Sequence, residues 1–231
     1  MINEHGQPIG MPLAWAAVPP PPGVRLEGRW CAVEPLDPER HAPDLHRANS
    51  GDDGSMWTYM PYGPFESETG YMDWCRTMAS NDDPYFVAVV DSTSGQAIGI
   101  CAYLRIEPAY GVIEVGHIVW SPALQRTTAA TEAMYLMMRH VFDDLGYRRY
   151  EWKCDDLNEP SRRAALRLGF TYEGTFRQAL VYKGRNRDTA WYSVTDAEWP
   201  RLRAGYETWL DPANFDDAGR QRESLGFPPA S

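Results

Sequence analysis

Residues 120–131 have the composition of a phosphate-binding loop. The segment Trp-Ser-Pro-Ala-Leu-Gln-Arg-Thr-Thr-Ala-Ala-Thr follows an apolar, β-branched run and precedes a helical pattern, so a strand should end and a long helix begin here. The first backbone N–H groups of a helix have no partners within it, and the helix dipole is positive at that end. Both properties favour phosphate. The hydroxyls of Thr127 and Thr128 and the charge of Arg126 can add to such a site.

The stretch from 158 to 174 predicts a short helix followed by a strand. Asn158 can cap the helix with its side chain, and Pro160 fits the first turn, where its missing N–H has no consequence. Gly169 should end the helix in the left-handed conformation, with Phe170 as a buried anchor. Ser161 then lies at the start of this helix.

Together the two stretches resemble the sequence blocks of the Gcn5-related N-acetyltransferase (GNAT) superfamily, and most closely its RimJ/RimL-type branch. That branch reads Asn-x-x-Ser, a short helix, then Leu-Gly-Phe-x-x-Glu-Gly. The matching residues are Asn158, Ser161, Leu168, Gly169, Phe170, Glu173 and Gly174. The resemblance covers roughly residues 25–195. It implies an α+β (mixed α/β) fold with a single central mixed sheet flanked by helices, and an enzyme that transfers acetyl from acetyl-coenzyme A to a primary amine.

The resemblance also implies that the loop before residue 131 binds the pyrophosphate of coenzyme A. The family pattern there is [Gln/Arg]-x-x-Gly-x-[Gly/Ala]. Gln125 and Ala130 match its outer positions, but Thr128 replaces the central glycine and Arg126 replaces a second frequent glycine. Without these glycines the loop must keep negative φ angles, or accept strain of roughly 1–2 kcal/mol per left-handed residue. The expected cofactor-binding residues are Ile118, Val119, Trp120, Gln125, Arg126, Thr127, Thr128, Ala129, Ala130, Asn158 and Ser161.

Roles near the thioester follow from the same resemblance. The Asn158 amide would contact the pantetheine arm, and the Ser161 hydroxyl would lie near the sulfur and protonate the leaving thiolate. Alternatively, Ser161 only helps to cap the helix through its backbone. Backbone donors at residues 118–120 would orient the thioester carbonyl.

Acyl transfer to an amine also needs a base, because an ammonium ion is not a nucleophile. In the superfamily the strand predicted at Val112–Trp120 faces the acetyl group. Glu114 on this strand is the first candidate base and His117, which titrates near neutrality, is the second. Alternate residues of a strand point to opposite faces, so Glu114 shares a face with Gly116 and His117 should lie on the other. The expected catalytic residues are Glu114, Ser161 and His117.

The elements that must position these residues can be read along the chain. Strands are predicted at 29–36, 85–90, 97–106, 112–120, 149–154, 171–180 and 190–194, and helices at 37–48, 67–78, 127–145 and 196–210. Residues 1–24 contain the run Pro19–Pro22 and read as an arm that Ile9 and Trp15 can dock on a surface. Residues 25–210 form the acetyltransferase domain, and 211–231 a tail.

Composition limits the other function classes. The formal net charge of the 231-residue chain is −10, which argues against nucleic-acid binding. No run of eighteen apolar residues predicts a membrane span, and the N-terminus does not resemble a secretory signal. The four cysteines are far apart and no His/Cys cluster exists, so we expect reduced thiols, no metal, and a cytoplasmic protein that needs only acetyl-coenzyme A.

The sequence leaves the acceptor open. It is a protein N-terminus or a small amine, and an amino sugar, an antibiotic or a polyamine are alternatives. A non-catalytic coenzyme A-binding or regulatory module is a rival, motivated by the substituted loop. Aromatic residues of the 50–66 loop either select the acceptor or belong to the core; they are Trp57, Tyr59, Tyr62 and Phe65. A homodimer is plausible because the C-terminal strands and the arm offer exposed edges.

Overall fold

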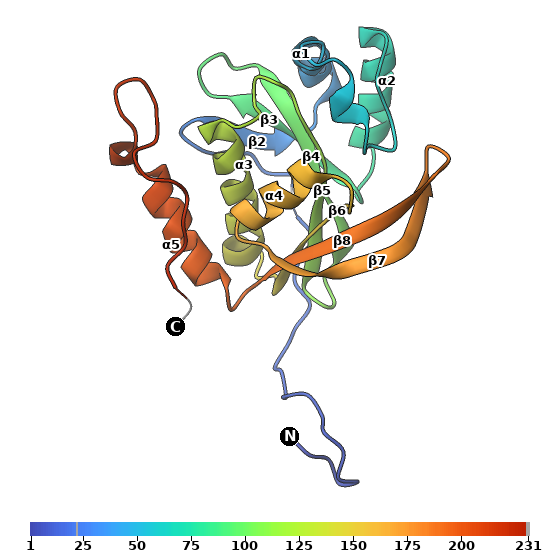
Figure 1. The fold of residues 1–231 in the computed structure, drawn as a ribbon, viewed down its shortest axis with the longest axis vertical. Helices are drawn as coiled ribbons and strands as arrows, with labels where there is room; N and C mark the ends of the chain where they lie inside the picture. Colours follow the sequence, from blue (N-terminus) through green and yellow to red (C-terminus); the bar gives the residue numbers. More distant parts are fainter. Residues whose placement is uncertain (22, 230–231) are drawn as a thin grey trace.

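The computed structural model describes residues 1–21 and 23–229, and in them a single mixed sheet of eight strands is flanked by helices (Figure 1). The strand order is β1-β2-β3-β4-β5-β6-β8-β7, and every neighbouring pair is antiparallel except β5 and β6. The strands are β1 (Leu26–Glu27), β2 (Cys31–Pro35), β3 (Tyr85–Asp91), β4 (Ala97–Glu107), β5 (Val112–Trp120), β6 (Arg149–Asp155), β7 (Thr171–Tyr182) and β8 (Arg185–Thr195).

The helices cover the two faces of the sheet unequally. They are α1 (Pro38–Asn49), α2 (Glu68–Ala79), α3 (Thr128–Arg139), α4 (Glu159–Arg167) and α5 (Trp199–Leu210), with short helical turns at Ser55–Trp57, His140–Asp144 and Pro212–Asn214. One core lies between the sheet and α3, α4 and α5, and a second lies under α1 and α2. Helix α3 is buried almost all round, which explains its apolar composition. None of the helices in the described residues is both long and apolar enough to cross a membrane.

Most predicted elements are confirmed, and the differences have local causes. The final helix begins at Trp199 and not at Asp196, because the Glu198 carboxylate accepts hydrogen bonds from the backbone N–H and the hydroxyl of Thr195 and holds a turn there. Strand β1 was not predicted, since two residues carry no readable alternation. The helix predicted at 127–145 ends in a π-helical turn before Gly146, whose φ is +76°.

The N-terminal arm touches the domain through Trp15 and Val18, whose backbone N–H donates to the Pro108 carbonyl at 3.2 Å, and its first residues run away from the domain (Figure 1). The Trp15 indole donates to the Ala109 carbonyl at 2.8 Å and lies under the Arg148 guanidinium. Trp15 therefore docks on the β4–β5 turn as expected, whereas Ile9 is 48% exposed and does not dock. Pro22, the last residue of the proline run, lies outside the described residues.

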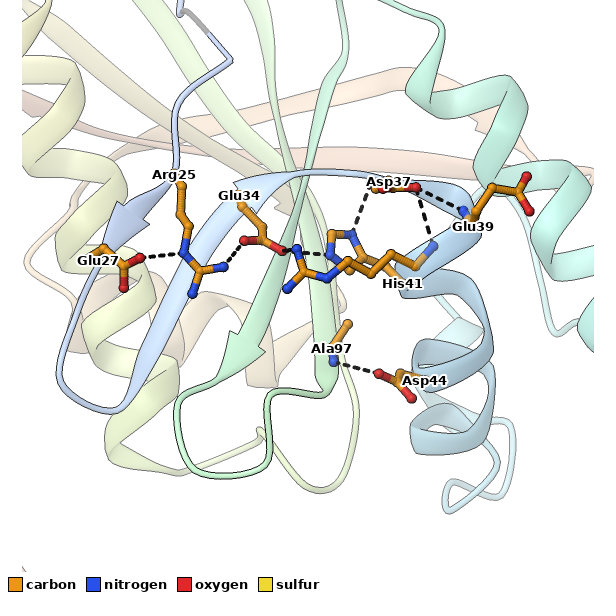
Figure 2. Close-up of polar contacts among 9 residues, drawn as sticks. Arg25, Glu27, Glu34, Asp37, Glu39, His41, Asp44 and Ala97 are labelled. Atoms are coloured by element: carbon orange, nitrogen blue, oxygen red, sulfur yellow. Dashed lines mark hydrogen bonds and ion pairs between the residues drawn. The ribbon is translucent and has the colours of Figure 1, made fainter.

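A buried carboxylate joins β2 to the start of α1 (Figure 2). Glu34 accepts hydrogen bonds from Arg25 and from Nε2 of His41 at 2.8 Å, and it forms an ion pair with Arg40 at 2.6 Å. The backbone N–H of Asp37 donates to Nδ1 of His41 at 3.0 Å, so the ring proton lies on Nε2. Asp37 also caps α1, as predicted. The network fixes α1 against the sheet on the face that carries the second core.

A second buried carboxylate, Glu132 of α3, holds the turn between β1 and β2. Its two oxygens accept from the backbone N–H groups of Arg29 (2.8 Å), Trp30 (2.7 Å) and Cys31 (2.9 Å). A Cβ at Gly28 would lie 2.5 Å from this carboxylate, so only glycine fits beside it. The first strands are thus connected to the helix that follows the candidate phosphate loop.

Replacing Glu132 should therefore destabilise the whole domain. We expect Glu132→Ala to lower the free energy of unfolding by about 3 kcal/mol, because three backbone N–H groups, that of Cys31 buried, lose a charged acceptor. Urea denaturation measures this. The matched control is Glu66→Ala, since Glu66 is exposed; it should stay within about 0.5 kcal/mol of wild type. Equal effects of the two substitutions would contradict the role of Glu132.

Candidate active site

The two parallel strands at the centre of the sheet separate part-way along their length. Pairing between β5 and β6 runs from Val112–Arg149 to Val115–Trp152. Beyond this point β5 continues along β4, while β6 continues along β8. The backbone of residues 116–120 therefore borders an opening on the side away from β4. This is the segment in which the sequence predicts donors to a thioester carbonyl.

A β-bulge in β5 changes which side chains face this opening. Gly116 pairs with Ala102 and Val119 pairs with Ile100, so two residues of β5, His117 and Ile118, lie opposite one residue of β4. His117 has a φ of +51°. The inserted residue reverses the alternation beyond Gly116. The prediction that His117 lies on the face opposite Glu114 is therefore wrong: its ring packs against Phe86, in the core under α1 and α2.

A cavity of about 620 Å³ lies at the opening and brings together three expected catalytic residues. Glu114, His117 and Ser161 all line it, as do the expected cofactor-binding residues Ile118 and Asn158. Val119 and Trp120 lie beyond the bulge, paired with β4. The wall is completed by β6, by the β7–β8 hairpin and by residues 59–61. Gln125 to Ala130 are not part of the lining.

Glu114 is a buried carboxylate between two cations. Its Oε2 lies 2.6 Å from Nη1 of Arg105 and 2.8 Å from Nζ of Lys153, and Lys153 also pairs with Glu151 at 2.7 Å. Burial raises the pKa of Glu114 above its ordinary value, and the two cations oppose that shift. The first candidate base thus lines the cavity, but its carboxylate already forms ion pairs with Arg105 and Lys153.

His117 is held as a neutral imidazole. Its Nδ1 lies 3.1 Å from the Tyr62 hydroxyl, and the two rings are stacked with centroids 5.7 Å apart. Burial lowers the pKa of His117 to about 4, and the nearby charges of Arg105 and Arg187 act in the same direction. At neutral pH the ring therefore carries no charge and can accept a proton.

The start of α4 presents a hydroxyl to the cavity. Asn158 caps the helix, with Oδ1 accepting from the backbone N–H of Ser161 at 3.2 Å. The indole of Trp152 donates to Ser161 Oγ at 3.0 Å, which leaves the hydroxyl hydrogen available for donation. Ser161 thus takes part in the cap through its backbone, and its side chain also lines the cavity. The left-handed Gly169 and the buried Phe170 are confirmed.

In the glycine-free loop before α3, one residue adopts the left-handed backbone conformation. Arg126 has a φ of +61°, whereas Thr128 is the first residue of the helix. The Thr127 hydroxyl donates to the Leu124 carbonyl at 2.7 Å and accepts from Ala130 N–H at 3.2 Å, so this hydroxyl is not the free phosphate donor that the sequence suggested. The N–H groups of Thr128 and Ala129 remain for an anion. Gln125 donates to the Trp120 carbonyl at 2.8 Å and fixes the loop to β5.

The 50–66 loop and the β7–β8 hairpin meet over the cavity. The Lys183 ammonium donates to the carbonyls of Trp57 (2.9 Å) and Gly63 (3.3 Å), and the Tyr59 hydroxyl donates to the Leu157 carbonyl at 3.0 Å. In Figure 1 the hairpin extends beyond the sheet toward the side of α2. Of the loop aromatics, only Tyr59 lines the cavity in the described part of the chain; the others pack in the second core.

Sequence reasoning missed the charged residues of the cavity floor. Lys153 and Asp155 of β6 line it, and Arg149 and Glu151 continue the same alternating positions of that strand. Charged residues at every second position of an otherwise apolar strand were a usable signal for a polar face at the site. Arg105 had no comparable signal.

Similarity to known proteins agrees with this geometry. Residues 32–171, more than half of the chain, match the family described as acetyltransferase (GNAT) domain. The chain belongs to the GNAT acetyltransferase family. The GNAT fold and the acyltransferase class predicted from sequence are thereby confirmed.

Relatives of this GNAT protein include solved structures. A GCN5-related N-acetyltransferase from Brucella melitensis is 48% identical, with a TM-score of 0.90 over 92% of this chain and 96% of that one. A GNAT-family protein from Chromobacterium violaceum ATCC 12472 is 42% identical, with a TM-score of 0.78 over 84% and 99%. The ribosomal-protein-serine acetyltransferase of Escherichia coli (strain K12) is 31% identical over 36% of this chain and 46% of its own, which agrees with the RimJ/RimL-type resemblance.

The shifted pKa of His117 predicts a pH-dependent stability. Above the unfolded value of 6.5 both states hold the ring neutral; below it the unfolded state binds a proton that the folded state takes up only near pH 4. Stability should therefore fall as the pH drops from 6.5 to 4, by about 2 kcal/mol at pH 5 from this group.

Urea denaturation of the wild type and of His117→Asn at pH 7 and pH 5 measures this contribution. The variant should lose about 2 kcal/mol less than the wild type over this interval. The same pH dependence in both proteins would contradict a buried, neutral His117.

Proposed function

We propose that this GNAT enzyme transfers acetyl from acetyl-coenzyme A to a primary amine, either a protein N-terminus or a small-molecule amine, by direct attack. The observation that carries the proposal is the opening between β5 and β6. It has the N-terminus of α3 in the segment that follows β5, and a cavity lined by Glu114, His117 and Ser161. The N-terminus of α3 suits the phosphates of the cofactor, and the side chains of the cavity suit acyl transfer.

Coenzyme A would extend along this opening. The N–H groups of Thr128 and Ala129, with the Arg126 charge, are the proposed phosphate site, and Gln125, Thr127 and Ala130 hold the loop in shape. Backbone groups of residues 118–120 would bind the pantetheine arm and orient the carbonyl. The Asn158 amide nitrogen would contact the same arm, because its oxygen already serves the helix cap.

Side chains that could accept and donate the protons of the reaction line the cavity. The neutral amine forms a bond to the acetyl carbon as the carbon–sulfur bond breaks. The proton that the nitrogen loses passes to Glu114 or to His117, directly or through water, and the departing thiolate takes a proton from Ser161. Glu114 is the first candidate because His117, with a pKa of about 4, is a weak base for an amine.

A covalent acyl-enzyme is not part of the proposal. All four cysteines are free and buried. Cys154 lines the cavity, but burial raises the pKa of its thiol, so the nucleophilic thiolate is scarce. Free thiols also support the proposed cytoplasmic location.

A homodimer is the proposed assembly. Strand β7 lies at the edge of the sheet and exposes Phe176, Leu180 and Val181, and an edge strand with apolar side chains offers a surface for a second copy. Sedimentation at micromolar concentration should give twice the mass of the 231-residue chain; a monomer throughout would contradict this assembly.

Two measurements test the function. Calorimetry should detect saturable binding of acetyl-coenzyme A, and mass spectrometry over a panel of amines and N-terminal peptides should find an acceptor that gains one acetyl group. No binding at millimolar acetyl-coenzyme A would contradict the proposal.

The proposed role of Ser161 gives a kinetic prediction. Ser161→Ala should lower kcat roughly 100-fold, because the thiolate leaves without a proton donor. The KM for acetyl-coenzyme A should change by less than about 3-fold, since the helix cap uses the backbone N–H. Ser161→Thr keeps a hydroxyl and is the matched control, with most of the activity retained. Unchanged kcat in Ser161→Ala would show that the hydroxyl takes no part in proton transfer.

A further inference from the structure

The cavity is positively charged although the chain is acidic. Among the residues that the structure describes, four basic side chains line it and two carboxylates oppose them. The basic residues are Arg105, Lys153, Arg177 and Arg187, and the acidic ones are Glu114 and Asp155. The chain as a whole has a formal net charge of −10. A positive lining repels a polyamine and attracts an acceptor that carries a negative group.

Two of the four cations are already neutralised. Arg105 and Lys153 both pair with Glu114, and Lys153 pairs with Glu151 as well. The remaining carboxylate, Asp155, is bound by uncharged donors: the Tyr182 hydroxyl donates to it at 2.8 Å and the Leu157 N–H at 2.9 Å. Within the described residues, the two cations of the lining that form no ion pair, Arg177 and Arg187, therefore both lie on the β7–β8 hairpin.

Of these two arginines, Arg187 is the one that is partly buried. Its Nε donates to the Thr189 hydroxyl at 3.2 Å, and its guanidinium lies 5.8 Å from the centre of the Tyr182 ring. Both partners are uncharged, and no carboxylate pairs with Arg187 within residues 1–21 and 23–229. A half-buried guanidinium loses hydration without a compensating charge, so a bound anion would stabilise it.

The position of Arg187 relates it to the reacting centre. Arg187, Thr189 and Trp191 occupy alternate positions of β8 and all line the cavity. The guanidinium is near enough to His117 to contribute to the lowered pKa of that ring. An anion on Arg187 would thus lie on the acceptor side of the cavity, close to the candidate bases.

The same wall has an apolar part. Phe176 stacks on Trp191 with ring centroids 4.6 Å apart, and Leu104, Leu180 and Met60 also line the cavity. These side chains suit an aliphatic or aromatic substituent. The contacts between the 50–66 loop and the hairpin close the cavity on that side, which suits a small molecule more than a long peptide.

We propose that the acceptor is a free amino acid with an apolar side chain, whose carboxylate pairs with Arg187. The planar guanidinium matches a carboxylate in a bidentate arrangement, whereas the corresponding group of a peptide N-terminus is an uncharged amide. This inference rests on the proposed acetyl transfer: the amino nitrogen gains the acetyl group, its proton goes to the base, and coenzyme A leaves as the thiol.

The test compares three acceptors with the purified full chain and acetyl-coenzyme A. They are L-phenylalanine, L-phenylalaninamide and 2-phenylethylamine. All three have the same aromatic group and a primary amine, but the first has a carboxylate, the second an uncharged amide and the third neither. The amino group of L-phenylalaninamide is less basic than that of L-phenylalanine, and the amino group of 2-phenylethylamine is more basic. A preference for L-phenylalanine over both compounds therefore cannot come from basicity. L-Phenylalanine should have the highest kcat/KM, by at least about 10-fold.

Variants assign the effect to one side chain. Arg187→Gln should lower the ratio of kcat/KM for L-phenylalanine to kcat/KM for 2-phenylethylamine on the order of 10- to 100-fold, and the ratio cancels any effect that the two substrates share. Acetylation of 2-phenylethylamine by the variant also reports a folded enzyme. Arg185→Gln is the matched control, because Arg185 is exposed and does not line the cavity; it should alter neither substrate.

Each contrary outcome has a distinct meaning. If the amide, the simple amine or an N-terminal peptide is acetylated at least as well as L-phenylalanine, the inference is wrong and the proposed acetyl transfer stands. Equal losses for both substrates in Arg187→Gln also overturn it. If acetyl-coenzyme A binds and no amine or peptide is acetylated, the proposed function fails and this inference with it.

Discussion

The site depends on one extra residue in the central strand. His117 and Ile118 of β5 lie opposite a single position of β4, and the parallel pairing with β6 has already ended at Val115. A regular strand would turn Glu114 and His117 to opposite faces. The bulge turns both to one cavity and leaves the backbone of residues 116–120 beside the opening. The candidate bases and the proposed thioester donors therefore share one local irregularity.

Several titratable side chains near the bulge are buried, and each one is stabilised in a different way. Glu114 is buried between Arg105 and Lys153, so the loss of hydration is offset by opposite charges, whereas His117 avoids the same penalty by staying neutral. Arg187 lacks such compensation within the described part of the chain, and this asymmetry distinguishes the acceptor side from the opposite wall. At the other wall, the cap at Asn158 and the hydrogen bond from the Trp152 indole hold Ser161 at the cavity.

Local rules predicted what local interactions determine. The cap at Asn158, the left-handed Gly169 and the helix that starts after Thr127 each depend on residues within one turn, so their types and spacing sufficed. The bulge was not predictable in this way, since it is a mismatch between two paired strands and the residue with positive φ is His117, not glycine. Arg187 reaches the cavity because β8 inserts between β6 and β7, a topology that spacing along the chain does not reveal.

A structure of the protein with coenzyme A bound tests the central claim most directly. The account predicts the sulfur inside the cavity, within about 3–3.5 Å of Ser161 Oγ and on the same side of β5 as Glu114 and His117, with the phosphates at the start of α3. The bulge should be unchanged, because it is part of the sheet and not a response to the ligand. A sulfur outside this cavity, or a His117 ring turned to the opposite face of the sheet, would contradict the account.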